Sequence, residues 1–130
     1  MQLNQFGAVM TFAIEMEDKL TTFYQEAAAK GGSNAAELSE RADSSAKRSK
    51  RILKSRQNDV TEITLEPIAG LDEADYALDL SATSATAINA AEEIVKKFYT
   101  EAAPKINVRE SRRVLERCLK EHAAFAALAD

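Results

Sequence analysis

Six consecutive residues, Phe23-Tyr24-Gln25-Glu26-Ala27-Ala28, recur almost unchanged as Phe98-Tyr99-Thr100-Glu101-Ala102-Ala103. In both copies a glutamate precedes the tyrosine by two helical turns, Glu17 in the first copy and Glu92 in the second, so each glutamate shares a helix face with its tyrosine. An Asn-x-x-Glu sequence follows each copy, at Asn34 and at Asn107, and is typical of the start of a helix. The repeat predicts two similar helical hairpins, which can bury their apolar faces against each other in a four-helix bundle.

The composition favours one helical domain over residues 1–130. The 130 residues carry a formal charge of −4, are 45% hydrophobic and include only four glycines and two prolines. This balance argues against a disordered chain and against a turn-rich all-β fold. The single cysteine, Cys118, cannot form an internal disulfide, and no basic and apolar leader precedes Lys19, so we expect a cytoplasmic protein. Polar residues interrupt every apolar stretch, so we expect no membrane span.

Apolar residues repeat at spacings of three and four in four segments, which is the pattern of amphipathic helices. We expect helices at residues 3–28, 34–57, 82–103 and 107–129. The long connection between the second and third helices is expected to be extended at 60–68, to contain a short helical turn at 72–80 that begins at Asp72, and to cross the end or side of the bundle. The predicted inner face of the second helix consists of Leu38, Ala42, Ser45, Ser49, Ile52 and Leu53.

Three ionisable residues lie in the predicted apolar faces. Glu17 is near the middle of the face of the first helix, Glu92 has the equivalent place in the third helix, and His122 is central in the fourth. A carboxylate removed from water must be paired, bound to a metal or neutralised by a raised pKa. We therefore expect the three residues to meet at one level of the core, with Tyr24 and Tyr99 placed to form hydrogen bonds with them.

With these residues the chain resembles, over nearly its whole length, the ferritin-like superfamily and within it the rubrerythrin-like proteins. The resemblance rests on the two Glu and Tyr pairs, the duplicated hairpins and the long crossover. It implies a di-iron site made of one Glu on each of two helices and a Glu-x-x-His pair on each of the other two. This chain keeps Glu17 and Glu92, but the two expected pairs are Ala46 with Ser49 and Leu119 with His122. Three of the six ligands are therefore missing, and the resemblance supports the fold more strongly than the chemistry.

Three interpretations of the site are open. In the first, a metal-free cluster neutralised by a histidinium or a shared proton is formed by Glu17, Glu92 and His122. In the second, the same three residues hold one weakly bound divalent metal such as iron. In the third, they form the centre of an iron-binding oxidoreductase or iron-handling protein, with Glu121 or Asp43 as additional ligands. An enzyme of this type would be a di-iron or mono-iron oxidase or peroxidase. The hypothesis we favour is a protein that has lost di-iron catalysis and acts through assembly or a protein partner.

Two further patterns concern partners. Six basic residues and no acidic one lie between Lys47 and Arg56, but no aromatic residue is interleaved and the overall charge is negative, so we expect no nucleic-acid binding. The first helix has a broad apolar arc in which Val9, Phe12, Met16 and Phe23 flank the core stripe. Val60, Ile63 and Leu65 of the connection could cover this arc, or the same face of a second copy could, and the latter predicts a homodimer.

Overall fold

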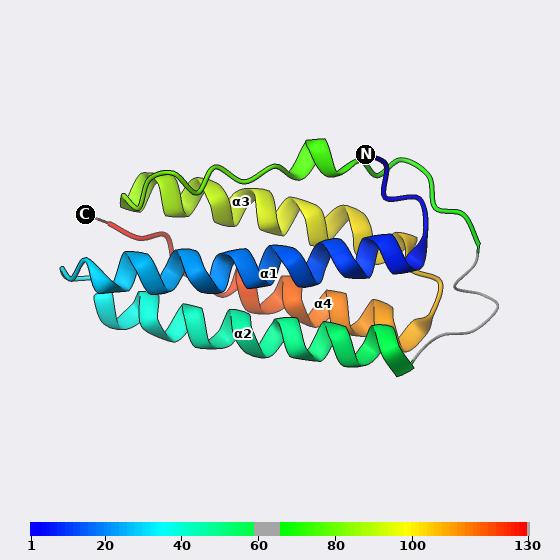
Figure 1. Ribbon diagram of the computed structural model, residues 1–130, viewed down its shortest axis with the longest axis horizontal. Helices are drawn as coiled ribbons and strands as arrows, with labels where there is room; N and C mark the ends of the chain where they lie inside the picture. Colours follow the sequence, from blue (N-terminus) through cyan, green and yellow to red (C-terminus); the bar gives the residue numbers. More distant parts are fainter. Residues whose placement is uncertain (59–65, 130) are drawn as a thin grey trace.

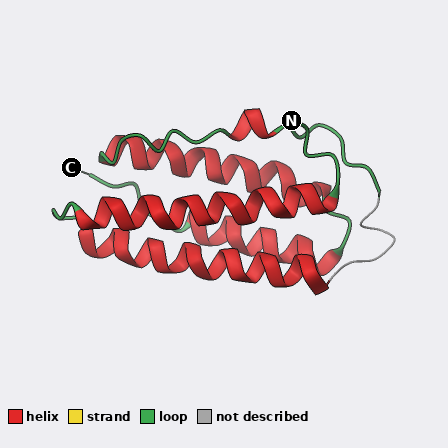
Figure 2. Ribbon diagram, in the orientation of Figure 1, coloured by secondary structure: helices red, strands yellow, loops and turns green. Residues whose placement is uncertain are grey.

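The computed structural model describes residues 1–58 and 66–129, and this part of the chain folds into four long helices (Figure 1). They are α1 (Phe6–Ala29), α2 (Ala35–Asn58), α3 (Ala85–Ala102) and α4 (Arg109–Ala123). Two short 3-10 turns, η2 (Glu73–Tyr76) and η3 (Ala103–Lys105), precede and follow α3. Figure 2 shows that the described part of the chain consists of helices joined by loops. The predicted all-α fold class is confirmed.

The helices pack as two pairs. α1 packs against α2, α3 packs against α4, and α2 also contacts α4 (Figure 1). Gly31 and Gly32, which end the first helix, adopt positive φ angles of 77° and 91°, a conformation that glycine reaches without steric cost. This tight reversal returns the chain along α1 and gives the first hairpin predicted from the sequence.

The connection between α2 and α3 runs along the length of α1. At its described beginning the Ile68 N–H donates to the Asn4 carbonyl at 2.8 Å, close to the start of α1. At its other end the Thr83 hydroxyl accepts a hydrogen bond of 2.8 Å from Lys30, just beyond the end of α1. The connection therefore passes from one end of the bundle to the other, so α3 begins at the end opposite to that at which α2 finishes (Figure 1).

The broad apolar arc of α1 is covered within one chain. Val9, Met16 and Phe23 are all buried. Phe12, at the edge of the arc, lies with its ring centroid 6.3 Å from that of Tyr76 in η2, which is itself 1% exposed. The residues we expected to provide this cover, at positions 60, 63 and 65, lie outside the described residues. The arc on which the homodimer prediction was based thus has its partner in the same polypeptide.

Several predicted element boundaries are wrong, for local reasons. α3 begins at Ala85 rather than at residue 82, because the Ser84 hydroxyl caps the Ala87 N–H. The turn expected at 72–80 shrinks to η2, although Asp72 caps it as predicted. α4 begins after Val108, and the Asn107 side chain donates instead to the Glu66 carboxylate at 2.9 Å. α4 also ends at Ala123, so the last residues of the predicted stripe are not helical.

One residue of the predicted inner face of the second helix is exposed. Leu53 on α2 is 40% exposed, whereas two arginines of the same helix, Arg41 and Arg48, are 2% and 0% exposed. The buried face of α2 is therefore rotated slightly from the predicted one, and it carries guanidinium groups where an apolar stripe was expected. This rotation determines the composition of the site described next.

Candidate functional site

The three predicted site residues meet in the core between α1, α3 and α4. The two ring nitrogens of His122 contact different carboxylates: Nε2 lies 2.8 Å from Glu17 Oε2, and Nδ1 lies 2.8 Å from Glu92 Oε2. The side chains of Glu17 and His122 are fully buried, and that of Glu92 is 7% exposed. His122 thus bridges the glutamates of the two halves of the chain.

The two repeated tyrosines complete the bridge in a reciprocal way. Tyr99 on α3 donates its hydroxyl proton to Glu17 Oε2 on α1 at 2.5 Å. Tyr24 on α1 donates to Glu92 Oε1 on α3. Each tyrosine therefore satisfies the glutamate of the other half rather than that of its own helix, and both tyrosines are fully buried. The sequence predicted that these residues join the cluster, and the structure adds the exchange between the halves.

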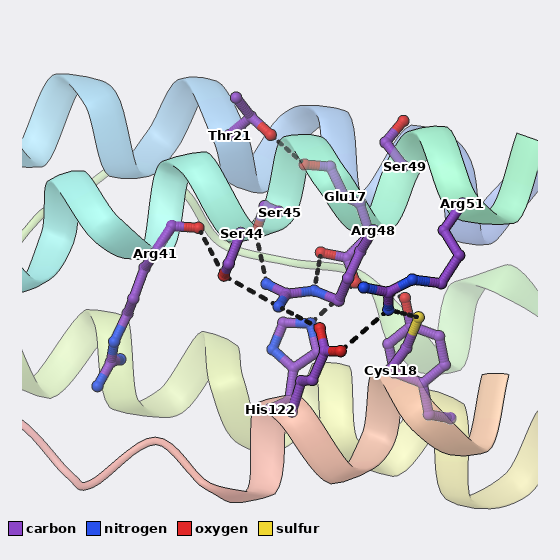
Figure 3. Close-up of polar contacts among 12 residues, drawn as sticks. Glu17, Thr21, Arg41, Ser44, Ser45, Arg48, Ser49, Arg51, Cys118 and His122 are labelled. Carbon is purple, nitrogen blue, oxygen red and sulfur yellow. Dashed lines mark hydrogen bonds and ion pairs between the residues drawn. The ribbon is translucent and has the colours of Figure 1, made fainter. Parts of the chain in front are cut away.

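Arg48 on α2 is the member of the cluster that sequence reasoning missed. Its Nε donates to Glu17 Oε1 at 3.1 Å, and its terminal nitrogens reach the hydroxyls of Ser45 at 2.9 Å and Ser44 at 3.0 Å (Figure 3). One terminal nitrogen also lies 3.3 Å from the carboxylate of Glu121. Each of the three guanidinium nitrogens thus has a hydrogen-bond partner in a place with no exposure to solvent, as burial of a charge requires.

A signal for Arg48 was present in the sequence. Arg41, Ser45, Arg48, Ile52 and Ser55 repeat at spacings of three and four, and all five are buried. From the sequence, Arg48 was grouped with the basic run between Lys47 and Arg56, and arginine is almost never fully buried unless it is paired. The uncompensated Glu17 on the neighbouring helix α1 was the observation that could have pointed to a buried arginine.

Ser49, the position that the repeat aligns with His122, lies outside the cluster. Its hydroxyl donates to Asp18 on α1 at 2.6 Å. Asp43 is exposed. Glu121 meets arginines, with one oxygen 3.3 Å from Arg48 and the other 3.1 Å from Arg51. Of the two residues considered as additional ligands, Asp43 therefore lies at the surface and Glu121 is paired with arginines.

The charges in the cluster compensate one another. Burial by itself raises the pKa of Glu17. The hydrogen bond and charge of His122, together with the charge of Arg48, outweigh this effect, so the pKa of Glu17 lies below its usual value. Burial lowers the pKa of His122, but its contacts with Glu17 and Glu92 outweigh this and raise the pKa above its usual value. A doubly protonated imidazole has a donor on each nitrogen, which both carboxylates need. Two carboxylates thus face one guanidinium and one imidazolium.

This arrangement does not fit a metal centre. A metal-bound imidazole gives the lone pair of one ring nitrogen to the ion, whereas both nitrogens of His122 face carboxylate oxygens. Glu17 and Glu92 lie against different edges of the ring, so the three side chains do not surround a common point. Within residues 1–58 and 66–129, no three His, Cys, Asp or Glu side chains are grouped so that they could hold a metal ion.

The cysteine beside the cluster is unsuited to nucleophilic chemistry. Cys118 is fully buried one turn before His122. Burial, and next the charge of Glu17, raise the pKa of its thiol to about 12. Because the thiolate is the reactive form of cysteine, this side chain behaves as a small core residue.

The basic run on α2 is divided between the core and the surface. Arg48 is in the cluster, Arg51 pairs with Glu121 at 3.1 Å and Arg56 is half-buried, whereas the three lysines are exposed: Lys47, Lys50 and Lys54. In the described part of the chain, no helix combines the length and the apolar character that crossing a membrane requires.

Comparisons of the chain with models of protein families, with curated proteins and with solved structures found no match.

Proposed function

We propose that this protein is a non-catalytic bundle of the ferritin-like type, in which a buried Glu-His-Glu-Arg cluster takes the place of a di-iron centre, and that it acts through assembly or a protein partner. The resemblance in sequence supports the ferritin-like type, as does the connection that runs along α1. The observation that carries the proposal is the engagement of both nitrogens of His122 by Glu92 and Glu17.

The donor chemistry disfavours a metal at this position. A di-iron centre requires bridging carboxylates and terminal ligands on each ion, and the chain offers two carboxylates and one imidazole. Both carboxylates already accept hydrogen bonds from His122 and from a tyrosine. Arg48 adds a permanent positive charge 3.1 Å from Glu17 Oε1, which repels a divalent cation.

The cluster supports a structural role because it joins all four helices. Glu17 belongs to α1, Arg48 to α2, Glu92 to α3 and His122 to α4, and each is hydrogen-bonded to at least one of the others. A polar network with all its members satisfied favours one arrangement of the helices over alternatives. We infer that the cluster fixes the register of the bundle and so the shape of the surface that it presents.

The proposal is tested first by metal content and iron oxidation. Protein purified without added metal is analysed by mass spectrometry and then titrated anaerobically with ferrous iron before oxygen is admitted. We expect far less than one ion per chain and no oxygen uptake. Two irons per chain with oxygen consumption would refute the proposal and establish the iron-handling alternative.

A matched variant distinguishes the metal-free cluster from the alternative in which one metal ion is bound. Melting temperatures of the wild type and of Glu92→Gln are measured with and without an excess of Zn²⁺ or Fe²⁺. An ion that binds the folded state raises the melting temperature by mass action. We expect no shift in either protein, whereas a rise in the wild type that Glu92→Gln abolishes would show that one ion is held by Glu92 and its neighbours.

The homodimer stays a prediction, and sedimentation equilibrium tests it. Among the described residues the large hydrophobic side chains classed as exposed are Met1 and Leu53. A dimer interface that resembles a divided core would require a larger exposed apolar area than these two side chains supply. A dimer that survives dilution to low concentration would therefore have to be held by polar contacts.

A further inference from the structure

The last described residues of the chain do not continue α4 but lie as a strap over the cluster. After Ala123 the backbone is held mainly by side chains of other elements. Arg41 on α2 donates to the Ala126 carbonyl at 2.9 Å. Asn89 on α3 makes two bonds to Leu128, donating to its carbonyl at 2.9 Å and accepting from its N–H at 2.8 Å. We call residues 124–129 the C-terminal strap.

The strap places an aromatic ring over the histidine of the cluster. The ring of Phe125 packs edge-on against His122, with centroids 5.6 Å apart at an interplanar angle of 89°. The Arg41 guanidinium stacks over the same ring at 4.4 Å from its centroid. Phe125 is thus held between a buried arginine and the imidazole, and it covers the cluster at this point.

A small cavity beneath the strap leads to the cluster. It has a volume of about 180 Å³, and its walls include Glu92, His122, Arg41 and Phe125. Among the cluster carboxylates Glu92 has the more exposed side chain, at 7%, against 0% for Glu17. The strap side of the bundle is therefore where the cluster comes closest to solvent.

The bonds that hold the strap are weaker as a set than those that hold the helices. The carbonyls of Ala126 and Ala129 and both backbone groups of Leu128 are bonded to side chains, without a cooperative helical ladder. Phe125 and Leu128 are only partly buried. Segments with few buried apolar contacts open at a lower free energy than the whole protein does.

From these contacts we propose that the C-terminal strap opens as a unit while the bundle stays folded, and that it controls the access of water and small solutes to Glu92 and His122. Opening removes Phe125 from His122 and takes away one wall of the cavity. This gate is independent of the proposed function, because it concerns solvent access and not metal content.

The test compares hydrogen exchange in the wild type and in Asn89→Ala. Alanine has the highest helix propensity, so this variant removes both bonds to Leu128 without weakening α3. In the wild type we expect the Leu128 amide to exchange much faster than the Leu115 amide in α4. Its exchange should proceed through a local opening, and low concentrations of urea should therefore not accelerate it. In Asn89→Ala we expect the exchange of the Leu128 amide to accelerate by at least about tenfold while that of Leu115 changes little.

The gate itself is read from the imidazole protons of His122 by nitrogen-15 NMR. We expect their exchange with water to accelerate in Asn89→Ala by the same factor as that of the Leu128 amide. Asn107→Ala is the matched control, because it removes a side-chain amide at the opposite end of the bundle, and both rates should keep their wild-type values. Exchange of Leu128 only through global unfolding would overturn the proposal. Acceleration at Leu128 without any at His122 would equally overturn it.

Discussion

Replacing Arg48 by methionine tests the claim that its guanidinium balances the charge of the core. Methionine keeps most of the aliphatic length and removes the charge, so the packing of α2 changes little. The variant leaves Glu17 fully buried and without the cation that lies 3.1 Å from its Oε1. The hydroxyls of Ser44 and Ser45 also lose the donor that they share.

The expected cost follows from what remains around the carboxylate. Breaking a buried ion pair by removal of one partner costs about 3 to 5 kcal/mol. His122 and Tyr99 still donate to the second oxygen of Glu17, so the lower end of this range applies. We expect Arg48→Met to lower the free energy of unfolding by about 3 kcal/mol. For a chain of this length that loss corresponds to a decrease in melting temperature of roughly 10 °C.

The assay is urea denaturation at neutral pH, followed by circular dichroism. Lys50→Met is the control, because it removes an exposed cation from the same helix and should change the free energy of unfolding by less than about 0.5 kcal/mol. Glu17→Gln combined with Arg48→Met should cost less than the sum of the single changes, because the two groups interact directly. A loss below about 1 kcal/mol in Arg48→Met would refute the charge-balance argument.

The remaining predictions concern pH, thiol reactivity and the tyrosines. Because the pKa of His122 is raised in the folded state, its contribution to stability is complete below its unfolded pKa near 6.5 and is lost as the pH rises through its folded pKa. His122→Gln should not show this loss when the free energy of unfolding is measured by urea titration at increasing pH. The lowered pKa of Glu17 has the opposite sign, so its contribution is present above 4.5 and is lost as the pH falls through the folded value, a loss that Glu17→Gln should not show in acid titrations. Cys118 should react with iodoacetamide at pH 8 only after unfolding, and rapid modification of the native protein would contradict its burial. Tyr24→Phe and Tyr99→Phe should each lower the free energy of unfolding by about 1.5 to 3 kcal/mol in urea titrations, and a change in only one of them would contradict the reciprocal arrangement.

The repeat and the helical periodicity predicted much of this molecule. The duplicated Phe-Tyr segment located Glu17 and Glu92 at equivalent places, and the stripe on the fourth helix located His122. These predictions succeeded because a helix fixes the direction of every side chain once its buried face is known. The reversal at Gly31 and Gly32 was recognised for a similarly local reason.

Two features depended on contacts between distant segments and were not predicted. The burial of Arg48 is stabilised by Glu17 on another helix, whereas an arginine without a known partner is expected at the surface. The end of α4 depends on Arg41 and Asn89, which supply the hydrogen bonds that Ala126 and Leu128 would otherwise form within a helix. In both cases tertiary hydrogen bonds outweighed a local preference that the sequence expressed correctly.

The exchange of partners between the repeated tyrosines has a consequence for cooperativity. Since Tyr24 donates to Glu92 and Tyr99 donates to Glu17, neither hairpin alone contains the phenol that its own glutamate uses in the complete bundle. An intermediate with only one hairpin folded therefore lacks both of these hydrogen bonds. The duplication that produced two interchangeable halves has, through these two hydroxyls, made each half dependent on the other for folding.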